Sequence, residues 1–242
     1  YGSQGASQRS AGVDGRPRSC RWDETLFWNV YYIKGAFLDA DKAFEVINGM
    51  RTVEMRVLLK AINTLVLARA LAAHPAINVQ CSAVEGNENY ALRERLMYLG
   101  LPAPLFTIDL DTEMGRGISR HAFQRFFDCL EPAFGLQVTL GQVNTVVVCP
   151  ALTSHSELSD EALREAGISL TTIRIAVGDE DPRSLLAHLM QAAELALEPE
   201  CPGFSRHFGQ PQAIDALYES IYVDVHRRYA ASRPRMQQML TS

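Results

Sequence analysis

The stretch that decides the fold is Thr171–Gly178, which reads TTIRIAVG. It is rich in β-branched residues, and its apolar residues alternate with the others, as in a β-strand with one buried face. On the opposite face Arg174 lies between Thr172 and Ala176, and these small residues leave room around its guanidinium. A planar cation in such a place is suited to bind a carboxylate through paired hydrogen bonds. The strand pattern alone leaves open a second interpretation, an ordinary solvent-exposed arginine. The predicted buried face consists of Ile173, Ile175 and Val177.

The composition excludes several classes of protein. The chain has 242 residues, of which 47% are hydrophobic and 21% are charged, and its formal net charge is −5. A mildly acidic chain has no electrostatic footprint for nucleic acid, and no apolar run approaches the roughly 20 residues of a membrane span. The five scattered cysteines indicate free thiols in a reducing compartment, and therefore a cytoplasmic location. These are Cys20, Cys81, Cys129, Cys149 and Cys201.

Hydrophobic periodicity predicts helices and strands that alternate along the chain. Apolar residues at helical spacing predict two consecutive helices over residues 43–73, interrupted near Gly49 and Thr52. Side-chain caps predict further helices after Ser159 and Asp181, the second with a proline at its first position. The order predicts an α+β fold, a small mixed sheet with helices packed on it. The other predicted strands are residues 78–84, 105–110 and 144–149, and the other predicted helices are residues 121–129 and 214–225.

Four segments are informative when their content and order are considered together. They are residues 48–56 (NGMRTVEMR), 139–146 (TLGQVNTV), 149–158 (CPALTSHSEL) and 167–181 (GISLTTIRIAVGDED). Their content and order resemble the carboxyl-terminal, small-domain part of the Cys/Met-metabolism (trans-sulfuration) family of pyridoxal-phosphate (PLP) enzymes, of fold type I. The first segment resembles the opening of that family's long inter-domain helix. The resemblance indicates a divergent branch of the family.

The resemblance implies roles for three residues. Arg174 matches the family arginine that binds the substrate α-carboxylate, and Thr139 and Asn144 match positions that lie along the substrate. Thr139 replaces a serine and still offers a hydroxyl. Asn144 replaces an acidic residue, which removes a charge and leaves the identity of the substrate open.

The family's cofactor lysine has no counterpart in this chain. The family carries that lysine in a Ser-x-Thr-Lys-like segment, whereas the only lysines here are Lys34, Lys42 and Lys60, in other contexts. The resemblance therefore implies PLP in the complete enzyme, but no covalent PLP on this chain. No residue is assigned as catalytic, and no histidine or cysteine spacing predicts a metal site.

Together these observations predict a flexible lead-in over residues 1–27, a small domain over residues 28–200, and a loop with an additional amphipathic helix over residues 201–242. The expected function is the substrate-carboxylate-binding part of a lyase or γ-replacement enzyme that acts on a sulfur-containing or homoserine-derived amino acid. The expected partners are the amino-acid substrate and a PLP-binding large domain or a second copy. The alternative is a non-catalytic interaction or regulatory domain that kept the fold. Without a large domain, the helix over residues 52–73 is expected to expose a large apolar surface.

Overall fold

The computed structural model describes residues 26–35, 37–110 and 114–233. The chain divides into two compact units, Tyr1–Val53 and Glu54–Ser242. Most of the expected lead-in lies outside the described residues. In the first unit a π-helical turn, η1 (Leu26–Tyr32), precedes α2 (Ala40–Arg51). Asp39 caps α2 by accepting a 2.9 Å hydrogen bond from the Lys42 amide. None of the residues described in this unit is buried.

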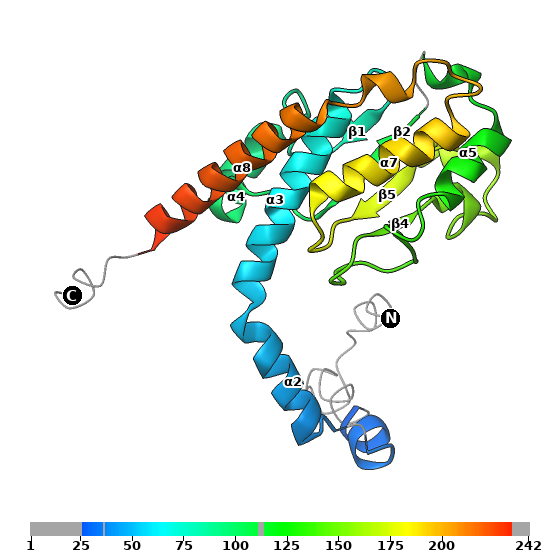
Figure 1. The fold of residues 1–242 in the computed structure, drawn as a ribbon. Helices are drawn as coiled ribbons and strands as arrows, with labels where there is room; N and C mark the ends of the chain where they lie inside the picture. Colours follow the sequence, from blue (N-terminus) through cyan, green and yellow to red (C-terminus); the bar gives the residue numbers. More distant parts are fainter. Residues whose placement is uncertain (1–25, 36, 111–113, 234–242) are drawn as a thin grey trace. The chain divides into compact units, whose positions relative to one another are not determined.

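The second unit is a five-stranded mixed sheet with helices around it, so the predicted α+β class is confirmed (Figure 1). The strand order is β1-β2-β5-β4-β3, and every pair is antiparallel except β3 with β4. The strands are β1 (Asn78–Gln80), β2 (Leu105–Asp109), β3 (Gly135–Leu136), β4 (Val146–Val148) and β5 (Ile173–Ala176). The α-helices are α3 (Val53–Ala72), α4 (Tyr90–Leu96), α5 (Arg120–Asp128), α6 (Asp160–Glu165), α7 (Pro182–Ala196) and α8 (Pro211–Ser232). The short 3-10 turns are η2 (Tyr98–Gly100), η3 (Gly115–Gly117), η4 (Pro150–Leu152) and η5 (Ser205–His207).

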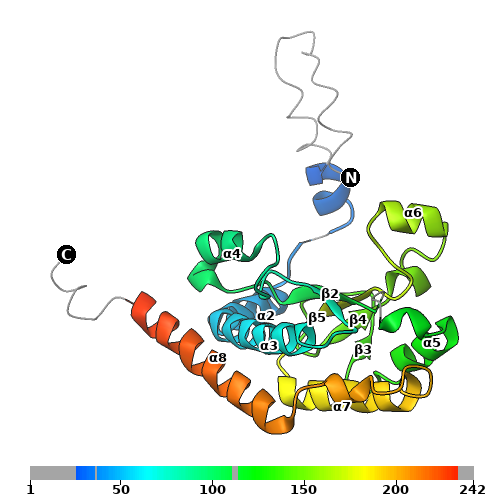
Figure 2. The same ribbon diagram turned by 90° about the horizontal axis from the view of Figure 1, so that it is seen from above.

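The predicted buried face of β5 is confirmed, although Thr172 and Ala176 on the opposite face are buried as well. Ile173 and Ile175 are buried in the main apolar cluster, which also includes residues of α3, α5, α7 and α8. Arg174 belongs to the other face, where its register partners are Thr107 on β2 and Val148 on β4. Helix α7 lies over one side of the sheet, whereas α4 and α6 lie on the other side (Figure 2). Arg174 therefore sits at the centre of the sheet and points away from the main core.

Helix α3 is buried more completely than the sequence indicates. From Leu58 to Leu71 its apolar residues other than the half-buried Leu59 belong to the core of the second unit or pack against it, so most of the helix is already covered. The expectation of a large exposed face along the whole helix is wrong for this part. Exposed apolar residues lie instead near its first turns and on α2: Val53, Met55, Val57, Phe44, Val46, Ile47 and Met50. No helix among the described residues has the length and apolar character that a bilayer crossing requires.

Two elements differ from the sequence prediction because of contacts made by neighbouring segments of the chain. Helix α4 is not apparent from periodicity because its buried residue is Arg93, which donates to the backbone carbonyls of Ser82 and Gly100. Strand β1 ends at Gln80 instead of continuing to Val84, because the chain turns there and the Val84 amide bonds the Cys81 carbonyl. The capped starts at Ser159 and Asp181 are confirmed.

A buried histidine joins the end of α3 to the segment that leads into α8. His74 is 1% exposed; its Nδ1 accepts from the Ala76 amide at 3.1 Å, and its Nε2 lies 2.8 Å from the Phe204 carbonyl. This pair of partners requires the neutral ring with its proton on Nε2. Burial lowers the pKa of His74; the bond to Phe204 opposes this shift, and the neighbouring His207 adds to it.

A glycine allows two loops to meet at the end of β5. A Cβ built on Gly178 would lie well inside 3.0 Å of the Val143 carbonyl oxygen and the Asn144 carbonyl carbon, which are both backbone atoms. The β5–α7 loop (residues 177–181) therefore packs directly against the β3–β4 loop (residues 137–145). The Gly178 amide also donates to Thr145 Oγ1 at 2.9 Å.

Protonation of His74 should destabilise the fold. The folded protein holds the pKa of His74 below that of the unfolded chain, so this stabilisation is complete above about pH 6.5 and is lost as the pH falls through the lower value. Between pH 7.5 and 5, the wild type should lose more unfolding free energy than His74→Asn, because only the wild type must protonate a buried imidazole. Urea unfolding at both pH values measures the difference, with the exposed His155→Asn as control. Equal losses in wild type and His74→Asn would contradict the expectation.

The substitution Gly178→Ala should lower the free energy of unfolding by about 1–3 kcal/mol, because the new methyl group forces backbone atoms of the β3–β4 loop to move. The matched control is Gly117→Ala, whose Cβ would meet only the Glu200 carbonyl at 3.9 Å. Denaturant titration of both variants gives the comparison. If Gly178→Ala were as stable as its control, the close loop contact would be absent in solution.

Candidate functional site

Arg174 and Thr139 are brought together by a direct hydrogen bond. The guanidinium Nη2 donates to the Thr139 backbone carbonyl at 2.8 Å. Arg174 is half-buried, and its Nε is buried with no hydrogen-bond partner among the described residues. Arg174 therefore retains donor capacity at the end of the β3–β4 loop, and the two residues that the sequence assigned to one site do lie beside one another.

Asn144 is placed less directly. It is exposed on the β3–β4 loop, and its amide nitrogen lies against Gly135, where a built Cβ would be 3.0 Å away. The structure shows no hydrogen bond between Asn144 and Arg174 within the part of the chain that it describes. A contact of Asn144 with a substrate stays a prediction.

The neighbouring Thr145 has a role that the sequence did not reveal. Its amide and hydroxyl donate to the two carboxylate oxygens of Glu180 at 2.7 and 2.8 Å, and Thr145 is fully buried. These bonds fix the end of the β3–β4 loop to the β5–α7 loop. The available signal was a lone polar residue between an exposed loop and the valine run of β4.

Two polar residues of α3 complete the site. Asn63 Nδ2 donates to the carbonyls of Gly178 and Glu180 at 3.1 and 2.9 Å. Lys60, three residues earlier and therefore on the same side of the helix, donates to the Gln142 carbonyl and lies 3.8 Å from Asp179 Oδ1. Sequence reasoning considered Lys60 only as a possible cofactor amine. A lysine on a buried face was the signal for its other role.

The arrangement favours anion binding over other chemistry. Arg174 combines a positive charge with an unused buried donor, whereas Lys60 is already engaged by a carbonyl and a carboxylate. Among the described residues, no group of three or more His, Cys, Asp and Glu side chains is placed to hold a metal ion. The site is therefore suited to bind a carboxylate, and nothing in it resembles a nucleophile with its base.

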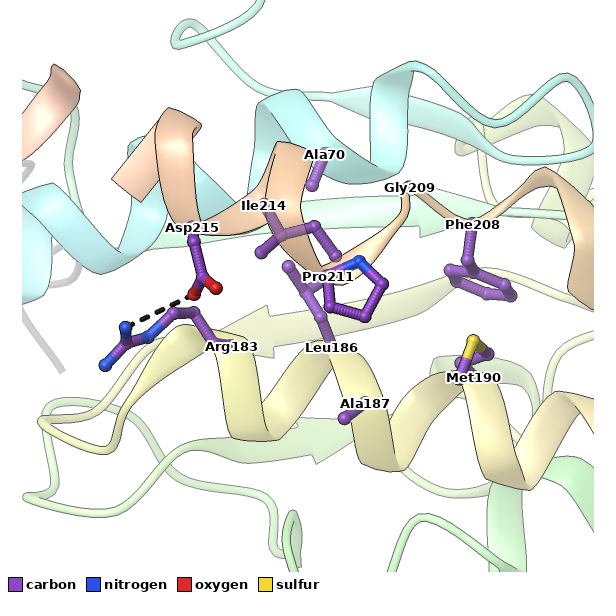
Figure 3. A pocket seen from close by; sticks show the side chains of 10 residues that line it. All are labelled: Ala70, Arg183, Leu186, Ala187, Met190, Phe208, Gly209, Pro211, Ile214 and Asp215. Carbon is purple, nitrogen blue, oxygen red and sulfur yellow. Dashed lines mark hydrogen bonds and ion pairs between the residues drawn. The ribbon is translucent and has the colours of Figure 1, made fainter. Parts of the chain in front are cut away.

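A separate hollow of about 100 Å³ lies between α7 and the start of α8 (Figure 3). Its lining is mostly apolar, and Arg183 and Asp215 form a 3.3 Å ion pair at one end. Arg183 also binds Asp181 at 2.7 Å, and this hydrogen bond lowers the pKa of the Asp181 carboxyl. Since Arg183 already has two carboxylate partners, this hollow does not present a second unpaired cation.

Comparison with known proteins gives a consistent result. The family model described as "Cys/Met metabolism PLP-dependent enzyme" matches residues 8–194. The chain is 32% identical over 161 residues to the L-methionine gamma-lyase of Pseudomonas deceptionensis. This alignment covers 66% of the chain and 38% of the relative. It is also 30% identical over 154 residues to the homocysteine synthase of Schizosaccharomyces pombe. This second alignment covers 63% of the chain and 34% of the relative.

Solved structures agree with the sequence relatives. A putative O-acetylhomoserine (thiol)-lyase from Campylobacter jejuni, which carries a pyridoxyl-lysine phosphate, superposes with a TM-score of 0.60 at 26% identity, over 72% of this chain and 40% of that one. A cystathionine gamma-lyase from Micromonospora echinospora gives 0.56 at 28% identity, over 71% and 43%. The chain thus spans less than half the length of these proteins. Since the family match extends over most of its residues, the chain belongs to the Cys/Met-metabolism family of PLP-dependent enzymes.

Proposed function

We propose that this chain forms the substrate-carboxylate-binding part of a PLP-dependent trans-sulfuration enzyme, a carbon–sulfur lyase or a γ-replacement enzyme. The observation that carries the proposal is the state of Arg174. It lies at the centre of the sheet, is held beside Thr139, and keeps a buried Nε without a protein partner among the described residues. A substrate α-carboxylate would satisfy this donor and neutralise the charge.

In this proposal Arg174 binds and orients the carboxylate, while the loop beside it shapes the site. Thr139 is partly exposed, so its hydroxyl can contribute a further hydrogen bond. Asn144 is neutral and exposed, and it adds an amide rather than a negative charge to the rim. The substrate is an amino acid, in keeping with the names of the relatives, which are a methionine lyase and a homocysteine synthase.

The lysines of this chain do not fit a covalent bond to PLP. Lys34 is exposed on the first unit, Lys42 is exposed and paired with Glu45 at 3.0 Å, and the Lys60 amine is held by Gln142 and Asp179. No described lysine therefore presents a free amine beside Arg174. We infer that the cofactor is held by a PLP-binding large domain or by a second copy, and that the protein works in the cytoplasm, where its free cysteines would stay reduced.

The substitution Arg174→Gln should abolish recognition of the carboxylate. The wild-type chain should bind L-methionine at least tenfold more tightly than 3-(methylthio)propylamine, which lacks the carboxylate. Loss of a charged hydrogen bond costs about 1.5–3 kcal/mol, which corresponds to roughly 10–100-fold in affinity. NMR titration measures both ligands. The matched control is Arg183→Gln, at the separate hollow, which should keep the preference. A preference that survives in Arg174→Gln would exclude Arg174 as the carboxylate ligand.

Added PLP should form no site-specific covalent adduct with this chain, because Lys60 is already engaged and the exposed Lys34 and Lys42 would react only as ordinary surface amines. After incubation with PLP and reduction with borohydride, mass spectrometry should find no adduct above that of a denatured control. A stoichiometric adduct on Lys60 would contradict this expectation. It would also show that the lysine leaves Gln142 and Asp179 to serve the cofactor.

A further inference from the structure

The β3–β4 loop is held almost entirely by polar contacts to its backbone. Its apolar side chains face solvent: Val138 is 64% exposed, Leu140 58% and Val143 64%. Apolar packing therefore contributes little to the position of this loop. Hydrogen bonds therefore keep it beside Arg174: those that Thr145 donates to Glu180 and those that the loop carbonyls accept.

Three of these carbonyls have donors from three different elements. Arg174 on β5 donates to the Thr139 carbonyl at 2.8 Å, and the Asp179 amide donates to the Val143 carbonyl at 2.7 Å. Between them, the Lys60 ammonium on α3 donates to the Gln142 carbonyl. Lys60 is thus the only side-chain link from α3 to this loop that the described residues show.

The burial of Lys60 is unusual enough to require a reason. The residue is 6% exposed, and a buried ammonium is costly unless it is paired and hydrogen-bonded. Its partner Asp179 is 3.8 Å away, and the Oδ1 atom that faces Lys60 has no hydrogen bond among the described residues. The ion pair is therefore loose, whereas the contact with the Gln142 carbonyl is close.

From this geometry we propose that Lys60 is a positioning residue of the carboxylate site. Its ammonium holds the β3–β4 loop on α3, so that Thr139 stays beside Arg174 and the site is formed before a substrate arrives. The inference rests on the proposed function. Asn63 supports the same side of the site, because it holds Gly178 and Glu180 from the next turn of α3.

The central test is Lys60→Met, which keeps a long apolar side chain and removes the charge and the donors. Amide hydrogen exchange should become about tenfold faster at Thr145 and Asp179, whose amides bond across the two loops, and stay unchanged in β2. The affinity for L-methionine should fall about tenfold, which is a loss in the same direction as that expected for Arg174→Gln. Lys42→Met, which breaks only an exposed ion pair, should alter neither measurement.

A double variant separates the two roles of Lys60. If the lysine only balances the charge of Asp179, then Lys60→Met with Asp179→Asn should restore both loop exchange and affinity, which would overturn the proposal. If the lysine acts through the Gln142 carbonyl, the double variant should remain as defective as Lys60→Met. Lys60→Gln, which is too short to reach that carbonyl, should show the same defects. Global unfolding of both single variants would make Lys60 a stability residue and overturn a positioning role.

The outcomes also separate this proposal from the proposed function. If Arg174→Gln loses the carboxylate preference while Lys60→Met retains wild-type exchange and affinity, the function stands and the role of Lys60 is wrong. If exchange rises in Lys60→Met but affinity is unchanged, Lys60 holds the loop without positioning the site, which also overturns the proposal. If Arg174→Gln has no effect on binding, the proposed function fails, and the exchange data then show only whether Lys60 holds the loop.

Discussion

The close approach of two loops at Gly178 is the constraint on which the candidate site depends. Because this position has no side chain, the β5–α7 loop reaches the backbone of the β3–β4 loop. Glu180 can then accept both hydrogen bonds of Thr145, and Asn63 can bind the carbonyls on either side of Asp179. Arg174, at the other end of the same loop, binds Thr139. One backbone contact thus sets the distance between the strand that carries the cation and the loop that surrounds it.

The parts of the fold that depend on local sequence could be predicted. The alternation in β5 identified its buried face, and the caps at Ser159 and Asp181 marked the starts of α6 and α7. Helix α4 was not predicted, because its buried residue is an arginine satisfied by two carbonyls from other segments. Burial of the whole middle of α3 was not predicted either, since its cover comes from strands and helices far along the chain.

In the candidate site, too, some residues could be identified from local sequence and others could not. The strand pattern drew attention to Arg174 but left open an ordinary solvent-exposed arginine, and the family resemblance supplied the carboxylate role together with Thr139 as a neighbour. Thr145, Glu180 and Lys60 did not stand out, because each acts through a contact at least 35 positions away in the sequence. Sequence pattern indicates which side chain can bind a ligand. It does not indicate which residues hold that side chain's surroundings in place.

Two cations of the site, the buried Lys60 and the half-buried Arg174, differ in how many partners the fold gives them. The Lys60 ammonium is paired with Asp179 and donates a hydrogen bond to the Gln142 carbonyl, so its contacts are within the protein. Arg174 has a carbonyl partner for one nitrogen but, among the described residues, neither an ion pair nor a bond to Nε. An unpaired buried charge is unfavourable by itself, and a carboxylate ligand would remove that penalty. In the proposed function, part of the binding energy would therefore come from a cost that the fold imposes on Arg174, and the contacts that impose it lie within the second unit of the chain.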